Sequence, residues 1–318
     1  MKEIRSGSGT SSAKIILIGE HSVVYGQPAI AMPVPAVSVT TRTVFRHGPV
    51  YLKCAFYEGE LVHGSEEVAG LKKIVPLILR QLNQPCADLL LTVSSDIPAE
   101  RGMGSSAAVS ISVVRSLCDY FAHPMDRRTM LSLVNLSEQC YHGAPSGLDA
   151  EAASNFHPLY FVRGKETAPI HTRIHSTLVI ADTGIKGQTS KAVAALKRRL
   201  EQDPGLKEDL SRLGRLTDSA RRALQTDQPE MLGRVMLEAH HVLKDLGVSH
   251  PALDRLVELA MTGGALGAKM TGSGWGGCII ALVRHHAQGV TLADRLRRAG
   301  ASGTWIQPLD EQPEFVNQ

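Results

Sequence analysis

The sequence predicts an α+β protein built from two domains. Short apolar or alternating runs of the β type are interleaved with longer runs that have helical spacing. The 318 residues are more than one core usually holds. A polar, proline-containing segment, "RGKETAPIHTR" (163–173), separates two blocks of different composition. We therefore expect one domain over residues 1–172 and a second over residues 173–318.

The N-terminal block predicts strands alternating with helices. Its apolar or alternating runs indicate strands over 14–19, 37–45, 51–57 and 87–95. Apolar positions at helical spacing indicate helices over 67–82, from Ser105 to Leu117, and from the N-cap residue Asp126 toward Cys140. The segment "PSGLDAEAAS" (145–154) reads as a turn that enters a further helix.

The C-terminal block opens with the strand-like run "STLVIADTG" (176–184). Helical spacing then predicts a group of helices over 189–202, 206–225, 229–246 and 251–262. The block should end in a strand, a glycine-rich loop, a strand, a helix and a strand, over 268–270, 271–277, 278–283, 286–299 and 304–309.

Composition and charge exclude several classes of protein. Hydrophobic residues make up 43% and charged residues 20%, and the net charge is only +3. Neither nucleic acid nor an anionic membrane is therefore expected as the main partner. The N-terminal apolar stretch spans five residues, too few for a signal peptide or a membrane span. The five cysteines form no C-x-x-C pair, which indicates reduced thiols and a cytoplasmic location.

The segment "PAERGMGSSAA" (98–108) places glycines and serines at the start of a predicted helix. Such a turn leaves backbone N–H groups unpaired, and the helix dipole adds positive potential there. These features are typical of a phosphate cradle. The alternative is a serine-capped helix after a flexible loop. A Walker loop is excluded because no lysine follows the last glycine.

A second glycine-rich segment, "KMTGSGWGG" (269–277), lies between two predicted strands. Gly272, Gly274 and Gly277 match the dinucleotide fingerprint, but a strand follows where that fold has a helix. The glycines indicate close approach of the backbone to another group. The alternative is an ordinary long hairpin loop.

Polar residues that could carry chemistry occur in two other places. Lys14, Glu20 and His21 flank the first strand. Glu138 and Asp149 are eleven positions apart with three turn-forming residues between them, so a helix–turn–helix could bring the carboxylates together. One could then bind a metal and the other accept a proton. Taken singly, the usual exposure of Asp and Glu favours a solvated surface charge for each.

These segments together resemble the kinase superfamily named for galactokinase, homoserine kinase, mevalonate kinase and phosphomevalonate kinase. "KIILIGEHSVVYGQPAIAMP", "PAERGMGSSAA" and "KMTGSGWGGC" resemble its three motifs, in the same order. "GEHSVVYGQPAIA" and "YHGAPSGLDA" are most similar to the mevalonate kinase family. Ser273 and Trp275 depart from this family, which prefers Gly or Ala there.

The resemblance implies the fold and the reaction. The N-terminal domain should be similar to domain 2 of ribosomal protein S5, and the C-terminal domain should be ferredoxin-like with added helices. The implied activity is ATP-dependent phosphorylation of the 5-hydroxyl of mevalonate to 5-phosphomevalonate, in isoprenoid biosynthesis. It also implies Mg²⁺ as cofactor, ATP and mevalonate as small-molecule partners, and a homodimer.

The resemblance further implies the site residues. The ATP phosphates would bind to the backbone of Gly102, Met103, Gly104, Ser105, Ser106 and Ala107. Ser106 and Glu138 would hold Mg²⁺. Asp149 would accept the proton of the substrate hydroxyl, and Lys14 would favour the developing alkoxide. The substrate would contact Glu20, His21, Ser146, Thr189 and Gly272.

Two alternatives to this function stay open. Another kinase of the superfamily, such as a phosphomevalonate kinase, would need additional cationic residues facing its phosphorylated substrate. A ligand sensor without catalysis could also use the same fold. The presence of Lys14, Glu138 and Asp149 argues against the sensor.

Overall fold

The computed structural model describes residues 5–142 and 147–310. The chain forms two compact units, each assembled from separate stretches of sequence. Unit 1 contains the residues up to Ala13, Val37–Pro98 and Gly104–Ser154. Unit 2 contains Lys14–Ala36, Ala99–Met103 and the residues from Asn155 onward. The division of the sequence at residues 172 and 173 into functional domains stays a prediction.

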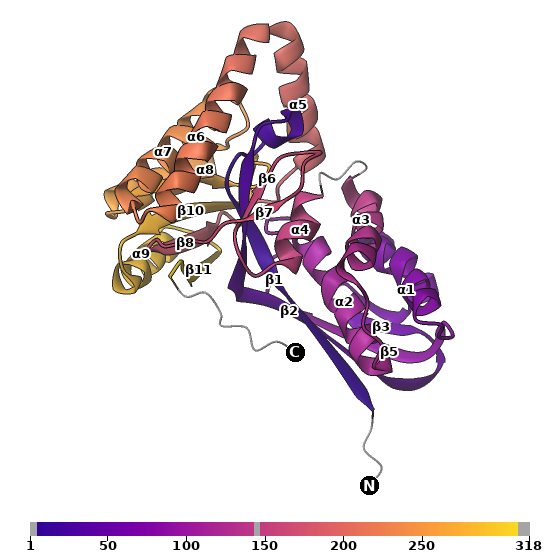
Figure 1. Cartoon of the computed structure of the whole chain (residues 1–318). Coiled ribbons are helices and arrows are strands. Elements are labelled where there is room, and N and C mark those ends of the chain that lie inside the picture. The colour runs from indigo at the N-terminus through magenta and orange to yellow at the C-terminus, as the bar shows by residue number, and fades with distance from the viewer. Residues whose placement is uncertain (1–4, 143–146, 311–318) are drawn as a thin grey trace. The chain divides into compact units, whose positions relative to one another are not determined.

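Unit 1 is a sheet combined with helices (Figure 1). Its strands are β1 (Ser6–Ile18) and β2 (Ala29–Pro49), which both continue into unit 2, β3 (Tyr51–Cys54), β4 (Tyr57–Glu60) and β5 (Ala87–Ser95). The strand order is β4-β3-β5-β2, with β1 also paired to β2. Strands β3 and β5 are parallel, while β5 and β2 are antiparallel. The helices are α1 (Ala69–Gln81), α2 (Ser105–Phe121), α3 (Arg127–His142) and α4 (Leu148–Ser154).

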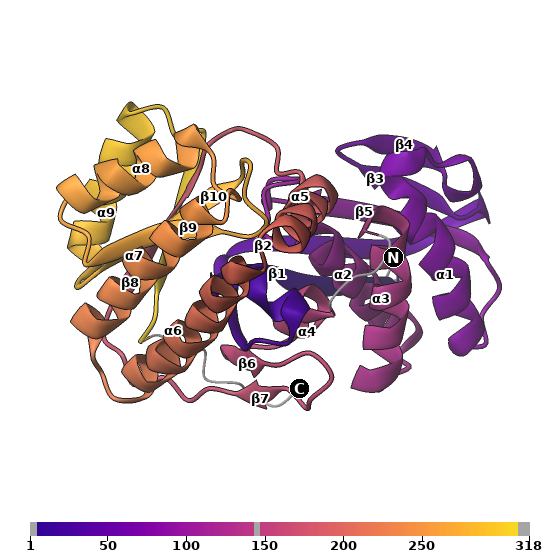
Figure 2. The same cartoon turned by 90° about the horizontal axis from the view of Figure 1, so that it is seen from above.

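Helix α2 is the centre of unit 1, because α1, α3 and α4 all pack against it (Figure 2). Buried hydroxyl pairs join it to β2: the Oγ atoms of Thr41 and Ser112 are 2.7 Å apart, and Thr43 and Ser116 repeat the contact at 2.7 Å. The backbone of strand β1 also lies directly against α2. A Cβ on Gly9 would lie 2.2 Å from the Ser112 carbonyl oxygen, so only glycine fits there.

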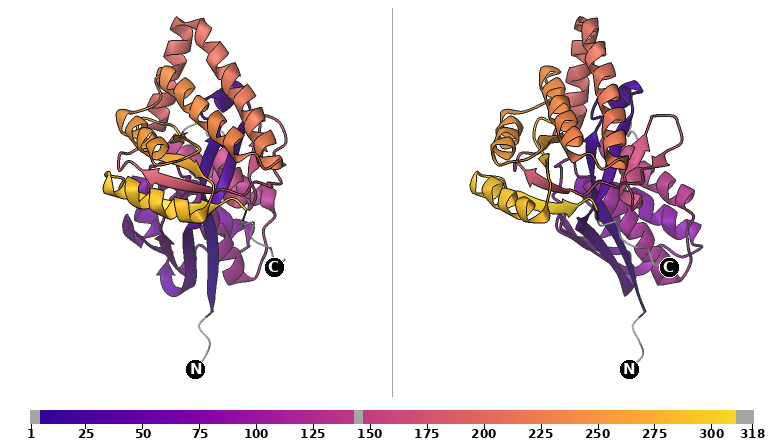
Figure 3. Two further views of the ribbon diagram at one scale, coloured as in Figure 1. Left: turned by 90° about the vertical axis from the view of Figure 1, so that its left-hand side faces the viewer. Right: turned by 60° about the vertical axis from the view of Figure 1, so that its left-hand side comes forward.

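Unit 2 contains a four-stranded sheet with helices against it (Figure 3). The strands of this sheet are β8 (Thr177–Asp182), β9 (Gly267–Thr271), β10 (Cys278–Val283) and β11 (Gly303–Pro308). Unit 2 also contains β6 (Leu159–Phe161) and β7 (Ala168–Pro169), and β6 pairs with the start of β2. Its helices are α5 (Thr189–Gln202), α6 (Lys207–Gln225), α7 (Pro229–Asp245), α8 (Pro251–Thr262) and α9 (His286–Arg298). Short 3-10 turns are η1 (Ser22–Tyr25) and η4 (Pro204–Leu206) here, with η2 (Leu61–His63) and η3 (Glu66–Val68) in unit 1.

The sheet of unit 2 has the order β11-β8-β10-β9, and each neighbouring pair is antiparallel. Strands β8 and β11 flank the β9–β10 hairpin in sequence, with helices between, which is the ferredoxin-like arrangement. Every residue of β8, β9 and β10 is buried, because α7, α8 and α9 pack against these strands. The predicted ferredoxin-like domain with added helices is therefore confirmed.

The predicted helices all exist within one to four residues of their expected ends, and the 87–95 strand is confirmed as β5. Three strand predictions are wrong in extent. The 51–57 strand is two strands, β3 and β4, with a turn at residues 55–56. Strand β1 begins at Ser6 and β2 at Ala29, both well before the predicted starts at 14 and 37. None of the described helices is long and apolar enough to cross a membrane.

Candidate functional site

The start of α2 in unit 1 has the features of an anion site. Gly104, the N-cap, has φ of +70° and carries no side chain to cap the helix. The first helical hydrogen bond runs from the Ala108 N–H to the Gly104 carbonyl at 3.0 Å. The N–H groups of residues 105–107 therefore precede the helical ladder, at the positive end of the dipole. Of the predicted phosphate residues, Gly104, Ser105, Ser106 and Ala107 lie here.

Ser106 and Glu138 are brought together in unit 1. The Ser106 hydroxyl donates to Glu138 Oε1 at 2.5 Å, from the first turn of α2 to the buried face of α3. The Glu138 residue is only 2% exposed. A hydroxyl and a carboxylate oxygen are hard donors of the kind that Mg²⁺ prefers, and such sites use one or two protein groups plus phosphate oxygens. The donor set thus fits the predicted metal.

Asp149 lies in the first turn of α4, also in unit 1, and is half-buried. Helix α4 packs against both α2 and α3, which carry Ser106 and Glu138. Ser146, predicted to contact the substrate, lies outside the described residues.

The rest of the predicted site lies in unit 2, where motif segments far apart in sequence meet. The Lys14 N–H donates to the Met103 carbonyl at 3.0 Å, and Lys14 is only 2% exposed. Gly102 and Gly272 face each other: a Cβ on Gly272 would lie 3.0 Å from the Gly102 Cα. The two glycines allow the 98–107 segment, called here the phosphate loop after its predicted role, to contact the 271–277 loop at Gly102 through bare backbone.

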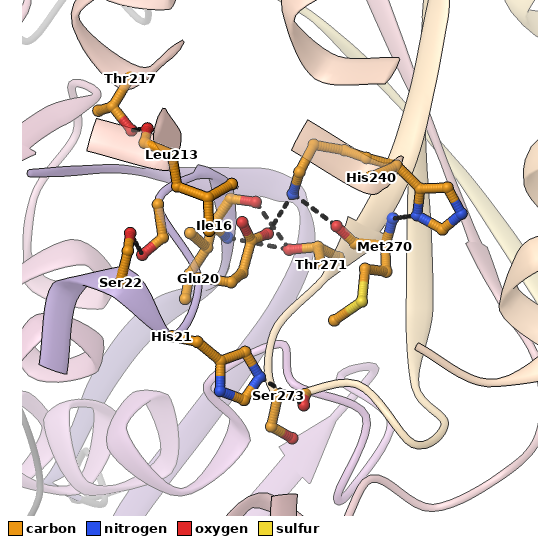
Figure 4. Close-up of polar contacts among 12 residues, drawn as sticks. Ile16, Glu20, His21, Ser22, Leu213, Thr217, His240, Met270, Thr271 and Ser273 are labelled. Atoms are coloured by element: carbon orange, nitrogen blue, oxygen red, sulfur yellow. Dashed lines mark hydrogen bonds and ion pairs between the residues drawn. The ribbon is translucent and has the colours of Figure 1, made fainter. Parts of the chain in front are cut away.

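Glu20 forms a buried ion pair with Lys269 of β9 (Figure 4). Both side chains are 0% exposed, and the Lys269 ammonium also donates to the Met270 carbonyl at 2.5 Å. Burial raises the pKa of the Glu20 carboxyl, while the charges of Lys269 and Lys14 oppose that rise. Burial likewise lowers the pKa of Lys269. Among the described residues, Glu20 Oε2 has no hydrogen-bond partner.

His21 is held in its ring orientation by the 271–277 loop. Its Nε2 is 2.9 Å from the Ser273 carbonyl oxygen (Figure 4). Burial lowers the pKa of His21 to about 4, so the ring is neutral at physiological pH. The Thr189 hydroxyl, from the start of α5, donates to the Ser273 hydroxyl at 2.9 Å. Ser273 therefore connects the predicted substrate residues His21 and Thr189.

Trp275, the bulky departure from the family, is accommodated within unit 2. Its φ is +55°, and its indole N–H donates to the Gly247 carbonyl at 3.0 Å. Its backbone N–H donates to the Val248 carbonyl at 3.1 Å. Carbonyl groups of the loop between α7 and α8 thus accept hydrogen bonds from both N–H groups of Trp275.

Sequence reasoning missed two ion pairs that support the site, Glu20–Lys269 and Arg101–Asp182. Their partners are 249 and 81 positions apart, so no local pattern connects them. One signal was available for Lys269. It is a lone charge in the otherwise uncharged strand "GAKMT", and a buried strand lysine requires a partner.

Two family models match the chain. The model described as "GHMP kinases N terminal domain" matches residues 70–156, and "GHMP kinases C terminal" matches residues 220–302. The first match includes the start of α2, Glu138 and Asp149, and the second includes β9 and the 271–277 loop.

Curated relatives and solved structures agree with these models. The mevalonate kinase of Pyrococcus horikoshii is 30% identical, over 90% of this chain and 91% of its own. That of Methanothermobacter thermautotrophicus is 31% identical, over 86% and 89%. The structure of L. major mevalonate kinase in complex with R-mevalonate matches with a TM-score of 0.85 and 25% identity, covering 96% of this chain and 98% of its own. The chain belongs to the mevalonate kinase family of the GHMP kinases.

Proposed function

We propose that the chain transfers the γ-phosphoryl group of ATP to the 5-hydroxyl of mevalonate, giving 5-phosphomevalonate and ADP. The observation that carries this proposal is its similarity to mevalonate kinases at 30–31% identity over 86–90% of its length. The geometry within each unit supports it. In unit 1 Gly104–Ala107 and Asp149 lie at helix starts, and Glu138 of α3 accepts from Ser106. In unit 2 Lys14 lies on β1, and Glu20 and His21 follow it in sequence.

The proposed chemistry assigns the proton to Asp149. The oxygen of the 5-hydroxyl forms a bond to the γ-phosphorus, the bond from that phosphorus to the β–γ bridging oxygen breaks, and ADP leaves with that electron pair. The hydroxyl proton passes to the Asp149 carboxylate as the new bond develops. The Lys14 ammonium favours the negative charge that appears on the attacking oxygen.

The proposed nucleotide site is the backbone from Gly102 to Ala107, whose N–H groups at the start of α2 suit phosphate oxygens. Ser106 and Glu138 would hold Mg²⁺ in this site. When bound there, the ion would neutralise charge on the phosphate oxygens. The short contact between the Ser106 hydroxyl and Glu138 Oε1, at 2.5 Å, supports pairing these two oxygens as ligands.

The proposed mevalonate contacts are Glu20, His21, Ser146, Thr189 and Gly272. The unpartnered Oε2 of Glu20 supports this assignment, because a buried acceptor is stabilised when a hydroxyl or amide donates to it. The neutral ring of His21 can also exchange hydrogen bonds with a substrate hydroxyl without adding charge.

A substrate panel tests the function. Purified protein is assayed with ATP and Mg²⁺ against mevalonate, phosphomevalonate, galactose and homoserine, and the product is identified by mass. The proposal predicts turnover of mevalonate alone, with phosphate on its 5-oxygen. Turnover of phosphomevalonate instead would identify the other kinase. Tight binding of mevalonate with no turnover of any of the four would identify a sensor.

Assembly and location follow from the family likeness as further proposals. We propose a homodimer in the cytoplasm, with all five cysteines unbonded as they are in the structure. Light scattering after size-exclusion chromatography measures the assembly directly, and a mass near 34.2 kDa would contradict the dimer.

A further inference from the structure

Arg101 of the phosphate loop is anchored on the end of β8. Its Nε lies 3.1 Å from the Asp182 carboxylate, and its Nη2 donates to the Gly184 carbonyl at 2.9 Å. The two side chains are only 15% and 7% exposed. Asp182 also accepts from the Gly184 N–H at 2.9 Å, so the carboxylate itself is held in place. This is a rigid, largely buried contact between segments 81 positions apart.

A second, exposed contact joins the same two segments. The Lys186 ammonium lies 2.5 Å from the Glu100 carboxylate, but these side chains are 72% and 57% exposed. The Gly187 N–H also donates to the Glu100 carbonyl at 2.8 Å. The exposed pair of Glu100 and Lys186 therefore provides a comparison, because removing one member of an exposed pair costs little while removing one member of a buried pair is strongly destabilising.

The 271–277 loop contacts both of these segments. The Gly277 N–H donates to the Ile185 carbonyl at 2.8 Å, and the Gly277 carbonyl accepts from the Thr183 N–H at 3.0 Å. A Cβ on Gly277 would lie 2.8 Å from the Arg101 carbonyl oxygen. Three segments thus converge on Arg101: the phosphate loop, the 183–188 loop that leads to Thr189, and the 271–277 loop that carries Ser273.

Two of the three guanidinium nitrogens of Arg101 form the contacts described above. Its Nη1 is buried without a partner among the described residues. The guanidinium is therefore held by Asp182 and Gly184, and a planar fork of this kind cannot be replaced by a lysine ammonium without loss of a contact.

We propose that Arg101 is a positioning residue that fixes the phosphate loop to the two loops carrying Thr189 and Ser273. The inference rests on the proposed function, because it assigns nucleotide binding to one of these loops and mevalonate binding to the others. Through Arg101, residues 99–103 of the phosphate loop, which include Gly102 and Met103 of the proposed nucleotide site, keep a fixed geometry relative to the loops of unit 2 that would bind the acceptor. Small displacements between reacting groups are costly in phosphoryl transfer, which depends on alignment.

The test compares Arg101→Met with Lys186→Met, which removes the exposed ion pair between the same segments. For each variant, the KM values for ATP and mevalonate, kcat, the Kd of a fluorescent ATP analogue, and the Tm are measured. Arg101→Met should lower kcat/KM for mevalonate by about 10²-fold and weaken binding of the analogue. Lys186→Met should stay within about twofold of the wild type. Arg101→Lys should recover part of the loss, because it retains the charge but not the fork.

Two outcomes would overturn the inference. The first is an Arg101→Met protein with a lower Tm but unchanged KM, kcat and analogue binding, which would make the contact merely structural. The second is an equal loss in Lys186→Met, which would remove any special role of the arginine. If Arg101→Met does not fold, Arg101→Lys and Asp182→Asn are measured in the same way. A wild type inactive with mevalonate would refute the proposed function, and analogue binding would still decide whether Arg101 positions the phosphate loop.

Discussion

The two units support their candidate functional residues differently. In unit 1 the site residues lie at the start of α2 and α4 and on α3, and Ser106 reaches Glu138 through a hydroxyl hydrogen bond. In unit 2 Lys14 lies on β1, Glu20, His21 and Gly272 lie in loops after strands, and Thr189 begins α5. The fully buried pair of Glu20 and Lys269 supports this set. Unit 1 presents backbone N–H groups and a carboxylate at helix starts, with the buried Glu138 bonded to a neutral hydroxyl, while unit 2 relies on a buried pair of opposite charges.

This difference has a consequence for mutations. A buried ion pair that loses one member leaves a desolvated charge, so changes to the candidate residues of unit 2 should destabilise the fold together with the site. A side chain at a helix start can be altered with little loss of core packing, so changes to the candidate residues of unit 1 should affect catalysis more than stability.

The largest expected effect on stability is that of Lys269→Met. It removes the partner of Glu20 in a site that is 0% exposed, and the free energy of unfolding should fall by about 3–5 kcal/mol. Urea denaturation measures this loss. The double variant Glu20→Gln/Lys269→Met should be more stable than Lys269→Met alone, because it leaves no unpaired buried carboxylate. A loss below about 1 kcal/mol in the single variant would contradict the contrast between the units.

A smaller loss of folding stability should appear when the pH is lowered. Burial lowers the pKa of His21 and of His240, each to about 4, from an ordinary value near 6.5. Between these two values the unfolded chain binds protons that the folded chain does not, so stability falls as the pH drops from about 6.5 to 4. Each imidazole can contribute on the order of 3 kcal/mol to that fall.

Carboxylates also titrate in this pH range. Histidine variants distinguish the contribution of the imidazoles to the pH dependence of stability from that of the carboxylates. His240→Gln should flatten the dependence of unfolding free energy on pH between 6.5 and 4, relative to the wild type. The matched control is His175→Gln, which substitutes a histidine whose side chain is 75% exposed. The prediction fails if the curves of wild type and His240→Gln are parallel throughout.

The smallest effect on stability belongs to unit 1. Ser106→Ala removes one proposed magnesium ligand and the hydrogen bond to Glu138, so it should raise the Mg²⁺ concentration for half-maximal activity while stability falls by about 1 kcal/mol. Ser132→Ala, an exposed hydroxyl on α3 that bonds only within its own helix, serves as the control. A normal magnesium titration for Ser106→Ala would place the ion on other groups.

Much of the fold follows from local patterns in the sequence. Helices are identified by apolar spacing and by caps such as Asp126, whose side chain accepts from the Thr129 N–H at 3.0 Å. The start of β1 has no such pattern, since "SGSGTSSA" is small and polar. It is a strand because Gly7 and Gly9 let the backbone lie directly on α2, a tertiary contact that local propensity does not encode.

The candidate site residues can be predicted from sequence motifs, but the ion pairs that hold them in place cannot. Glu20 stands out beside the first strand, while its partner Lys269 is 249 positions away. Arg101 and Asp182 show the same limit at 81 positions. The lone charge of Lys269 indicates that it needs a partner, but no local pattern identifies which residue that is. Long-range pairing of this kind depends on how strands and loops meet in the folded unit.

Asp149→Asn tests the central claim most directly. The substitution keeps the shape of the side chain and removes its basicity. With kcat, the Kd values of ATP and mevalonate, and the unfolding free energy measured on the same preparation, the account predicts a fall in kcat of about 10²–10⁴-fold. It also predicts nearly unchanged Kd values and a stability change within about 1 kcal/mol. A folded Asp149→Asn variant with near-normal kcat would contradict the account, because Asp149 would then act only as a helix N-terminal charge.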